Sequence, residues 1–127
     1  MEVAILARIL IIDDEDLSRN MLSQALTRAG YDVSTACDGT EGIELFRSVL
    51  ADLIITDILM PGKEGLETIM ELRRDFPDVK IIAMSGGGRT GNLNFLDIAE
   101  RLGAQRTLQK PFHLQDVLQL VQEVLQD

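Results

Sequence analysis

The chain has a single cysteine, Cys37, and few basic residues: 12 Lys and Arg stand against 21 Asp and Glu, for a net charge of −9. One cysteine excludes an intrachain disulfide framework and a multi-cysteine metal site, and it fits a reducing compartment, so we expect a cytoplasmic protein. Binding to nucleic acid or to anionic lipid begins with neutralisation of phosphates by Lys and Arg. The acidic balance therefore predicts neither nucleic acid nor a membrane surface as a direct partner.

Long hydrophobic runs are absent as well. The most apolar stretch, Val3 to Ile12, is interrupted by Arg8 and is far shorter than the roughly 20 residues that a membrane span needs. Glu2 opens the chain and acidic residues close this stretch, which is not the pattern of a secretory signal. With 127 residues, 46% of them apolar and 26% charged, the composition predicts one globular domain over residues 1–127.

What the chain does have is an alternation of short apolar segments with amphipathic ones. The segments predicted as strands are Arg8 to Ile12, Tyr31 to Ala36, Leu53 to Thr56, Val79 to Met84 and Arg106 to Leu108. Each is followed by apolar residues at helical spacing, and Gly30 and Gly103 stand where helix ends are expected. Five strand-helix units predict a parallel, doubly wound α/β sheet whose strand order periodicity leaves open.

The helical segments carry apolar residues that we expect to face the core. They are Leu17, Met21, Leu22, Ala25 and Leu26; Ile43, Phe46, Val49 and Leu50; Leu66, Ile69, Met70 and Phe76; Leu93, Leu96, Ala99 and Leu102; and Leu114, Val117, Leu118, Val121 and Leu125.

Reactive side chains stand at the carboxyl ends of the predicted strands. Asp13 and Asp14 follow the first strand, Asp57 the third, Ser85 the fourth and Lys110 the fifth. Ligands of open α/β sheets bind outside these ends, so the side chains can converge on one crevice. Carboxylates brought together repel one another unless a cation intervenes, and hard oxygen ligands suit Mg²⁺. The pattern therefore predicts an acidic Mg²⁺ site.

Four motifs in this order resemble the receiver domain of two-component response regulators, over about residues 8 to 126. They are Ile11-Ile-Asp13-Asp14-Glu15, Thr56-Asp57-Ile-Leu-Met60-Pro61-Gly62, Ala83-Met84-Ser85 and Lys110-Pro111-Phe112. The resemblance implies a flavodoxin-like sheet of five parallel strands in the order 2-1-3-4-5, flanked by five helices. That order would place the first and third strands side by side.

The resemblance also implies roles for single residues. Asp57 would accept a phosphoryl group from a sensor histidine kinase or a histidine phosphotransfer protein, and Lys110, preceding a cis proline, and Ser85 would contact the phosphoryl oxygens. The Mg²⁺ ligands would be Asp14, Asp57, the backbone carbonyl of Leu59 and, directly or through water, Asp13. A downstream protein target would then respond to phosphorylation.

Two departures from the family pattern bear on signalling. Thr107 stands where the family usually has an aromatic switch residue, and the stretch from Ser85 to Lys110 is longer than usual, with the surplus expected around Gly86 to Gly91. We therefore expect reordering of that glycine-rich loop to couple phosphorylation to the face formed by the fourth helix, fifth strand and fifth helix. Phe95 and Ile98 are candidates for a partner surface on that face. Leu59 and Gly87 offer no polar side chain to hold an attacking water, which predicts a persistent phosphoryl group.

Several functions stay open at this point. Because the sequence stops soon after the last predicted helix, we expect a stand-alone receiver that either binds a target or relays its phosphoryl group to another histidine. A phosphorylation-independent interaction module is a further alternative. A haloacid-dehalogenase-like phosphatase could use Asp14-Glu-Asp16, but the chain has no later acidic pair and that mechanism leaves Asp57 without a role. We therefore expect no turnover of external substrates.

Overall fold

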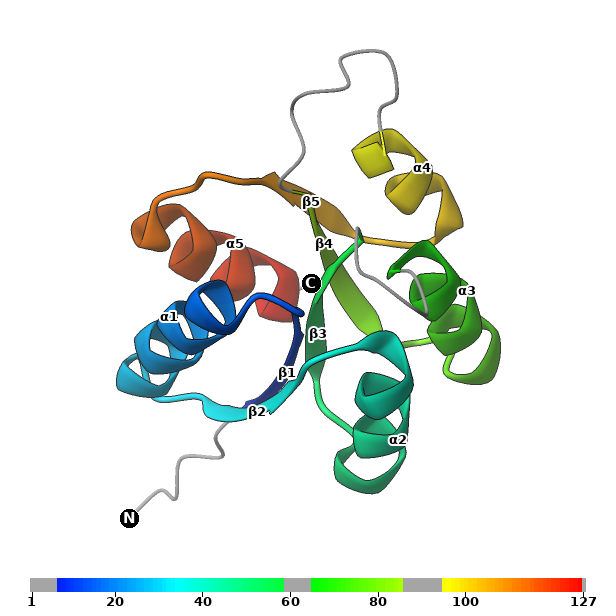
Figure 1. The fold of residues 1–127 in the computed structure, drawn as a ribbon, viewed down its shortest axis with the longest axis horizontal. Coiled ribbons are helices and arrows are strands. Elements are labelled where there is room, and N and C mark those ends of the chain that lie inside the picture. Colours follow the sequence, from blue (N-terminus) through cyan, green and yellow to red (C-terminus); the bar gives the residue numbers. More distant parts are fainter. Residues whose placement is uncertain (1–6, 59–64, 86–94, 127) are drawn as a thin grey trace.

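Five parallel strands form one sheet at the centre of the molecule, in the order β2-β1-β3-β4-β5 (Figure 1). The computed structural model describes residues 7–58, 65–85 and 95–126, with only the backbone of residues 95 and 96. The strands are β1 (Arg8–Ile12), β2 (Asp32–Ala36), β3 (Leu53–Asp57), β4 (Lys80–Ser85) and β5 (Arg106–Gln109). The predicted fold class and the predicted strand order are both confirmed.

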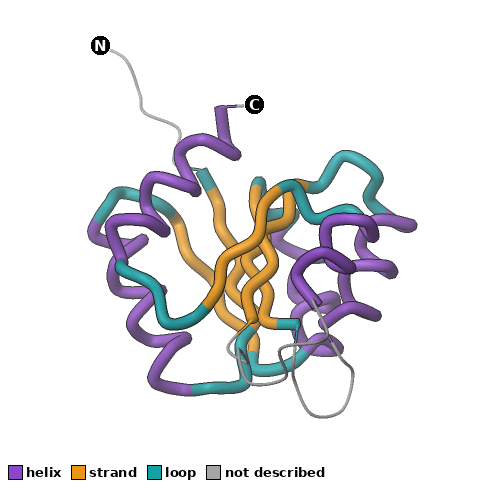
Figure 2. Tube along the Cα trace, turned by 90° about the horizontal axis from the view of Figure 1, so that it is seen from above, coloured by secondary structure: helices purple, strands orange, loops and turns teal. Residues whose placement is uncertain are grey.

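Helices cover both faces of this sheet (Figures 1 and 2). They are α1 (Asp16–Arg28), α2 (Gly39–Val49), α3 (Gly65–Asp75), α4 (Phe95–Leu102) and α5 (Leu114–Gln126). The first and last of these helices lie on one face, and the other three lie on the opposite face. No helix in the described part of the chain is long and apolar enough to cross a membrane.

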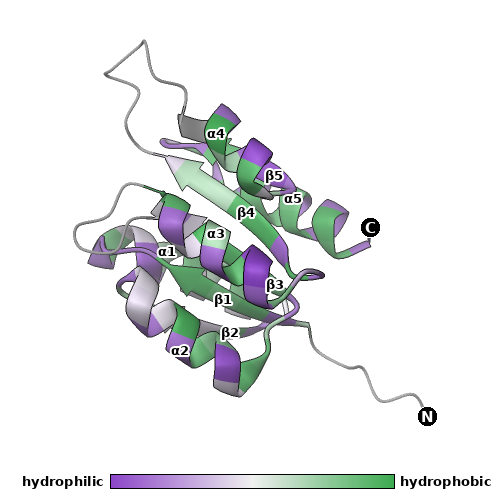
Figure 3. Ribbon diagram, turned by 90° about the vertical axis from the view of Figure 1, so that its right-hand side faces the viewer, coloured by the Kyte–Doolittle hydropathy of each residue, from purple (hydrophilic) through white to green (hydrophobic). Residues whose placement is uncertain are grey.

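The burial of β1 shows why the central strands are apolar over most of their length. Ile9 and Ile11 pack in the cluster under α1 and α5, while Leu10 and Ile12 pack in the cluster under α2, α3 and α4. Successive side chains of a strand point to opposite faces, so a strand covered on both sides has consecutive hydrophobic residues and not an alternation of apolar and polar ones. Figure 3 shows β1 and much of β4 in the green of hydrophobic residues.

Helix ends follow from local sequence. The Asp38 side chain accepts a hydrogen bond of 2.8 Å from the backbone N–H of Glu41 and so caps the start of α2. Gly30 and Gly103 follow α1 and α4 with φ of 101° and 125°, a conformation that glycine adopts without a steric penalty. The predicted helix ends at these two glycines are confirmed.

Four of the residues expected in the core are on the surface instead. Leu17, Met21, Leu50 and Met70 are 73%, 47%, 59% and 53% exposed. The predicted stripes were too wide, because a helix lying on a flat sheet buries only its central row of side chains, such as Leu22 and Leu26 on α1. Leu50 is not in the helix but ends it in the left-handed conformation, with φ of 54°. Leu93 and the side chain of Leu96 lie outside the described residues.

Candidate functional site

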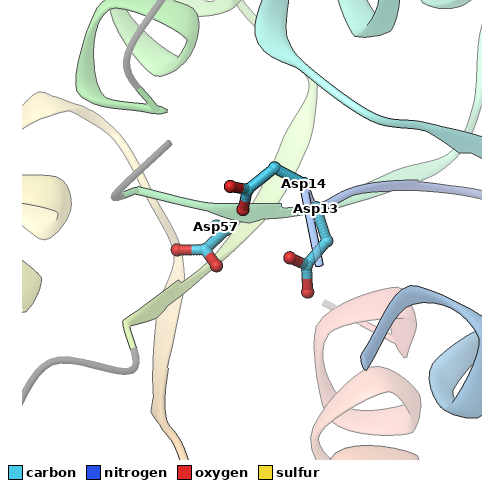
Figure 4. A group of neighbouring side chains, drawn as sticks. All are labelled: Asp13, Asp14 and Asp57. Carbon is cyan, nitrogen blue, oxygen red and sulfur yellow. The ribbon is translucent and has the colours of Figure 1, made fainter. Parts of the chain in front are cut away.

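Three carboxylates meet at the carboxyl edge of the sheet. Asp13 directly follows β1, Asp57 is the last residue of β3, and these strands are neighbours, with Ile12 paired to Thr56. Asp14 joins them, and one carboxylate oxygen from each of the three lies within 4.8 Å of the others. Figure 4 shows the three side chains gathered at the ends of the two strands. Adjacent parallel strands thus place acids that are 44 positions apart, Asp13 and Asp57, at one point.

Lys110 bridges two of these carboxylates. Its Nζ lies 3.0 Å from Oδ2 of Asp13 and 3.0 Å from Oδ2 of Asp57. Its backbone N–H donates a 2.8 Å hydrogen bond to the carbonyl of Ser85, which fixes the start of the β5–α5 connection against the end of β4. The Lys110–Pro111 peptide bond is cis, as the family resemblance implies.

The electrostatics of this bridge rest on its burial. The Asp13 side chain is fully buried, that of Asp57 is 8% exposed and that of Lys110 is 14% exposed. Burial by itself lowers the pKa of Lys110, but the hydrogen bonds and charges of Asp13 and Asp57 together outweigh it, so its pKa lies above the ordinary value. The ammonium group is therefore retained at neutral pH as a fixed positive charge beside Asp57.

Asp13 is held on every side, whereas Asp14 faces solvent. The Oδ1 atom of Asp13 accepts a 3.0 Å hydrogen bond from the backbone N–H of Glu15, its Oδ2 accepts from Lys110, and its own N–H donates to the carbonyl of Ala36. The Asp14 side chain is exposed at the mouth of the cluster. Asp13 is thus a fixed member of the cluster, and Asp14 is the member that a solvated ion can approach.

The donor set fits a small divalent cation. All three ligands are carboxylate oxygens, and Mg²⁺ prefers oxygen at about 2.1 Å, so opposite ligands of its octahedron lie about 4.2 Å apart. The separation of the carboxylate oxygens, within 4.8 Å, comes close to that spacing. Three carboxylates beside one ammonium also leave an excess of negative charge, which a divalent cation would compensate. The residues present therefore fit Mg²⁺.

Gly65 allows the start of α3 to approach the backbone of Asp57 closely. It is the first residue of α3, and a Cβ atom built on it would lie 2.1 Å from the carbonyl oxygen of Asp57 and 2.2 Å from Cα of Ile58. Only a residue without a side chain allows α3 to begin this close to the end of β3. The sequence analysis did not single out Gly65.

The other predicted site residues are placed as follows. Ser85 is the last residue of β4 and is buried, 8% exposed, while Thr107 is half-buried on β5, paired with Ala83. Ile98 is 37% exposed on α4. Phe95 begins α4, but its side chain lies outside the described residues, as do Leu59 and the glycine-rich segment from Gly86 to Gly91.

Sequence reasoning missed two side chains around the cluster. Glu15 lies 3.5 Å from Nζ of Lys110 with its side chain 67% exposed, and Arg19 donates a 2.8 Å hydrogen bond to the backbone carbonyl of Asp13. The available signal for Arg19 was its position, one helical turn beyond the acidic run.

A groove also adjoins the site. The exposed Leu17 and Met21 of α1 line it together with Pro111 and Phe112, and Lys110 and Glu15 form its polar end, over a volume of about 400 Å³. A larger hollow of about 720 Å³ lies elsewhere, lined by Phe46, Phe76 and neighbouring residues at the start of β4, and it includes none of the clustered acids. The chemistry of the side chains, and not the size of the hollow, therefore marks the functional site.

Comparisons with known proteins agree with this geometry. The family described as "Response regulator receiver domain" matches residues 9–122. The chain is 33% identical to the chemotaxis protein CheY of Thermotoga maritima, covering 92% of this chain and 96% of that protein. It is 36% identical to the DNA-binding transcriptional regulator NtrC of Azospirillum brasilense, covering 94% of this chain but only 24% of that protein.

Solved structures give the same result. The receiver domain protein of Clostridium thermocellum superposes with a TM-score of 0.86 at 31% identity, covering 95% of each chain. The chain spans only 24% to 45% of the length of the first curated regulators that it matches, all at 36% identity. The matches extend over most of this chain, and the chain belongs to the receiver domain family of two-component response regulators, with a CheY-like fold.

Proposed function

We propose that this receiver domain accepts a phosphoryl group on Asp57 in a Mg²⁺-dependent transfer from a phosphohistidine of a sensor histidine kinase or a histidine phosphotransfer protein. The observation that carries this proposal is the buried bridge of Lys110 between Asp13 and Asp57, with 3.0 Å to each. A lysine fixed there can neutralise an oxygen of a phosphoryl group that arrives at Asp57.

The transfer needs an oxygen nucleophile in line with the donor. A carboxylate oxygen of Asp57 forms a bond with phosphorus while the P–N bond of the phosphohistidine breaks, and the electron pair of that bond stays on the imidazole nitrogen. The Lys110 ammonium turns from Asp57 to a phosphoryl oxygen and keeps its hydrogen bond to Asp13. Ser85, at the end of the adjacent strand, donates its hydroxyl to another phosphoryl oxygen.

A bound Mg²⁺ would supply the remaining positive charge to the phosphoryl oxygens. Its side-chain ligands would be Asp14 and Asp57, with Asp13 bound directly or through water. The backbone carbonyl of Leu59 stays a predicted ligand, because it lies outside the described residues.

The groove beside Lys110 is the surface that we assign to the phosphodonor protein. It places exposed apolar side chains, Leu17 and Met21, next to the phosphoryl-accepting site. A helix that carries a histidine could bury its apolar side there while it presents the imidazole to Asp57.

How phosphorylation would be passed on to a partner is proposed from the sequence alone. Phosphorylation at Asp57 would change the face formed by α4, β5 and α5, where Thr107 and the exposed Ile98 lie. A downstream protein would bind that face, or the phosphoryl group would pass to another histidine in a relay.

The structure argues against the phosphatase alternative. A haloacid-dehalogenase-like site would need Asp14 and Asp16 together, but Asp16 begins α1, pairs with Arg19 and has a side chain 83% exposed. The acid that does join Asp13 and Asp14 is Asp57. We therefore propose modification of the chain itself and no turnover of external phosphomonoesters.

The test is the intact mass of the protein after incubation with acetyl phosphate, with and without Mg²⁺. We expect a gain of one phosphoryl group that requires Mg²⁺ and disappears in Asp57→Asn. Asp78→Asn is the matched control, since Asp78 is exposed and precedes β4 at the opposite edge of the sheet. An equal gain in Asp57→Asn, or a gain that does not depend on Mg²⁺, would refute the proposal. Absence of any adduct with both acetyl phosphate and a phosphorylated histidine kinase would refute it as well.

A further inference from the structure

Arg19 contacts the acidic turn at two points. Its Nη1 donates a 2.8 Å hydrogen bond to the backbone carbonyl of Asp13, and its backbone N–H donates a 2.9 Å hydrogen bond to the carbonyl of Glu15. Asp14 is the residue between these two carbonyls. The second contact is the ordinary helical hydrogen bond between residues four apart, which any residue at position 19 would form, so only the contact with the Asp13 carbonyl is specific to arginine.

The first of these contacts depends on the guanidinium group. The carbonyl of Asp13 lies where the chain has left β1 and has not yet entered α1, so the arginine supplies a hydrogen bond to a group between two elements. The guanidinium is a rigid fork, and its Nη2 pairs with Asp16, which fixes the orientation in which Nη1 meets the carbonyl. The Arg19 side chain is only 17% exposed, so water competes weakly for this bond.

Asp14 needs such support more than its neighbours do. Asp13 is held by Lys110 and by the N–H of Glu15, and Asp57 is held by Lys110 inside a fully buried strand. Asp14 is exposed, and the direction of its carboxylate follows from the backbone of the turn that carries it. We propose that Arg19 is a positioning residue for the metal-binding carboxylate of Asp14, acting through the hydrogen bond of its guanidinium group to the carbonyl of Asp13.

This proposal rests on the Mg²⁺ site of the proposed function. It predicts a change in Mg²⁺ affinity opposite in direction to the change that the charge of Arg19 alone would cause. Arg19 is a cation close to the acidic cluster, so removing its charge should strengthen the binding of Mg²⁺ by electrostatics alone. Loss of positioning should weaken the binding, because groups that orient metal ligands typically contribute about 10-fold to 100-fold to metal affinity. The direction of the change therefore separates the two effects.

The experiment is isothermal titration calorimetry of MgCl₂ into the wild-type chain and into three variants. We expect the dissociation constant for Mg²⁺ to rise about 10-fold in Arg19→Met, which keeps the apolar stem but loses the donors. It should rise less in Arg19→Lys, which keeps the charge and a single donating group. Arg28→Met is the control, because Arg28 is exposed in the last turn of the same helix, about 14 Å further along its axis. This variant should bind Mg²⁺ with the wild-type dissociation constant.

Circular dichroism melts accompany the titrations and confirm that each variant is folded at the titration temperature. If Arg19→Met does not fold, Arg19→Lys decides the question. Unchanged or tighter binding in the folded Arg19 variants would overturn the positioning role while the Mg²⁺ site of the proposed function stands. A wild-type chain that binds no Mg²⁺ would overturn both.

Discussion

The close contact between Gly65 and the end of β3 predicts that a side chain at position 65 would displace Asp57. In Gly65→Ala, the new methyl group would lie 2.1 Å from the carbonyl oxygen of Asp57, whereas ordinary contacts begin at 3.4 Å. The neighbours are backbone atoms, so no side chain can rotate away. The helix and the strand must therefore separate by more than 1 Å.

The strand end that would have to move is held in place by two further contacts. The N–H of Ile58 donates a 2.9 Å hydrogen bond to the carbonyl of Met84, and the hydroxyl of Thr56 donates a 3.0 Å hydrogen bond to the carbonyl of Asp57. Overpacking at such a site costs about 1–3 kcal/mol, and we expect the upper end of that range because only backbone can give way. A displacement of about 1 Å at a reacting group can lower a rate about 100-fold.

Two measurements check this prediction. Urea denaturation should show a loss of about 3 kcal/mol in the free energy of unfolding, and the rate constant for phosphorylation by acetyl phosphate should fall about 100-fold at a temperature where the variant is folded. The control is Gly30→Ala, because Gly30 has a φ of 101° and no atom within 4 Å of its built Cβ. It should lose about 1 kcal/mol through backbone strain and phosphorylate at the wild-type rate. The reasoning would be refuted if Gly65→Ala had a free energy of unfolding within about 1 kcal/mol of the wild type and a phosphorylation rate constant within about twofold of it.

Three other predictions follow from the charges on the chain. Partial desolvation and then the charges of Glu41 and Asp38 raise the pKa of Cys37, so iodoacetamide should modify it more slowly than free cysteine at pH 8, and Glu41→Gln should speed the reaction. The pKa of Lys110 is raised above 10.5, so the charged ammonium contributes its full stabilisation below pH 10.5, and this contribution is lost as the pH rises through the raised pKa. In that pH range the free energy of unfolding should fall more steeply in the wild type than in Lys110→Met. Mg²⁺ at 100 times its dissociation constant should stabilise the wild type by about 2.7 kcal/mol, an effect that EDTA removes in a thermal melt.

The sequence was sufficient for the fold because the signals were redundant. The central strands β1 and β3 are apolar over most of their length, and helix ends were marked by residues such as Gly30 and Gly103. The errors came from side chains whose environment is set by distant parts of the chain. Leu17 and Met21 have the same spacing on α1 as core residues, but the surface they face is formed by Pro111 and Phe112, which no local pattern can place.

The convergence at the site was predictable for a topological reason, and its internal contacts were not. Acids at the ends of parallel strands must share one edge of the sheet, so Asp13 and Asp57 could be brought together from the sequence once the family resemblance supplied the strand order. The roles of these residues, and the cytoplasmic location expected from the single cysteine, stay predictions.

The contacts of Arg19 show where such reasoning stops and what the structure adds. An arginine near the start of a helix that follows acids is read from sequence as an exposed i, i+3 ion pair, here with Asp16, and such pairs contribute little to stability. Its second contact, with the carbonyl of Asp13, depends on the angle at which α1 leaves the end of β1, which sequence spacing does not encode. Because of that angle, the guanidinium group of Arg19 reaches the carbonyl of Asp13 and holds the backbone next to Asp14. For this reason we expect Arg19 to matter more for Mg²⁺ affinity than for stability.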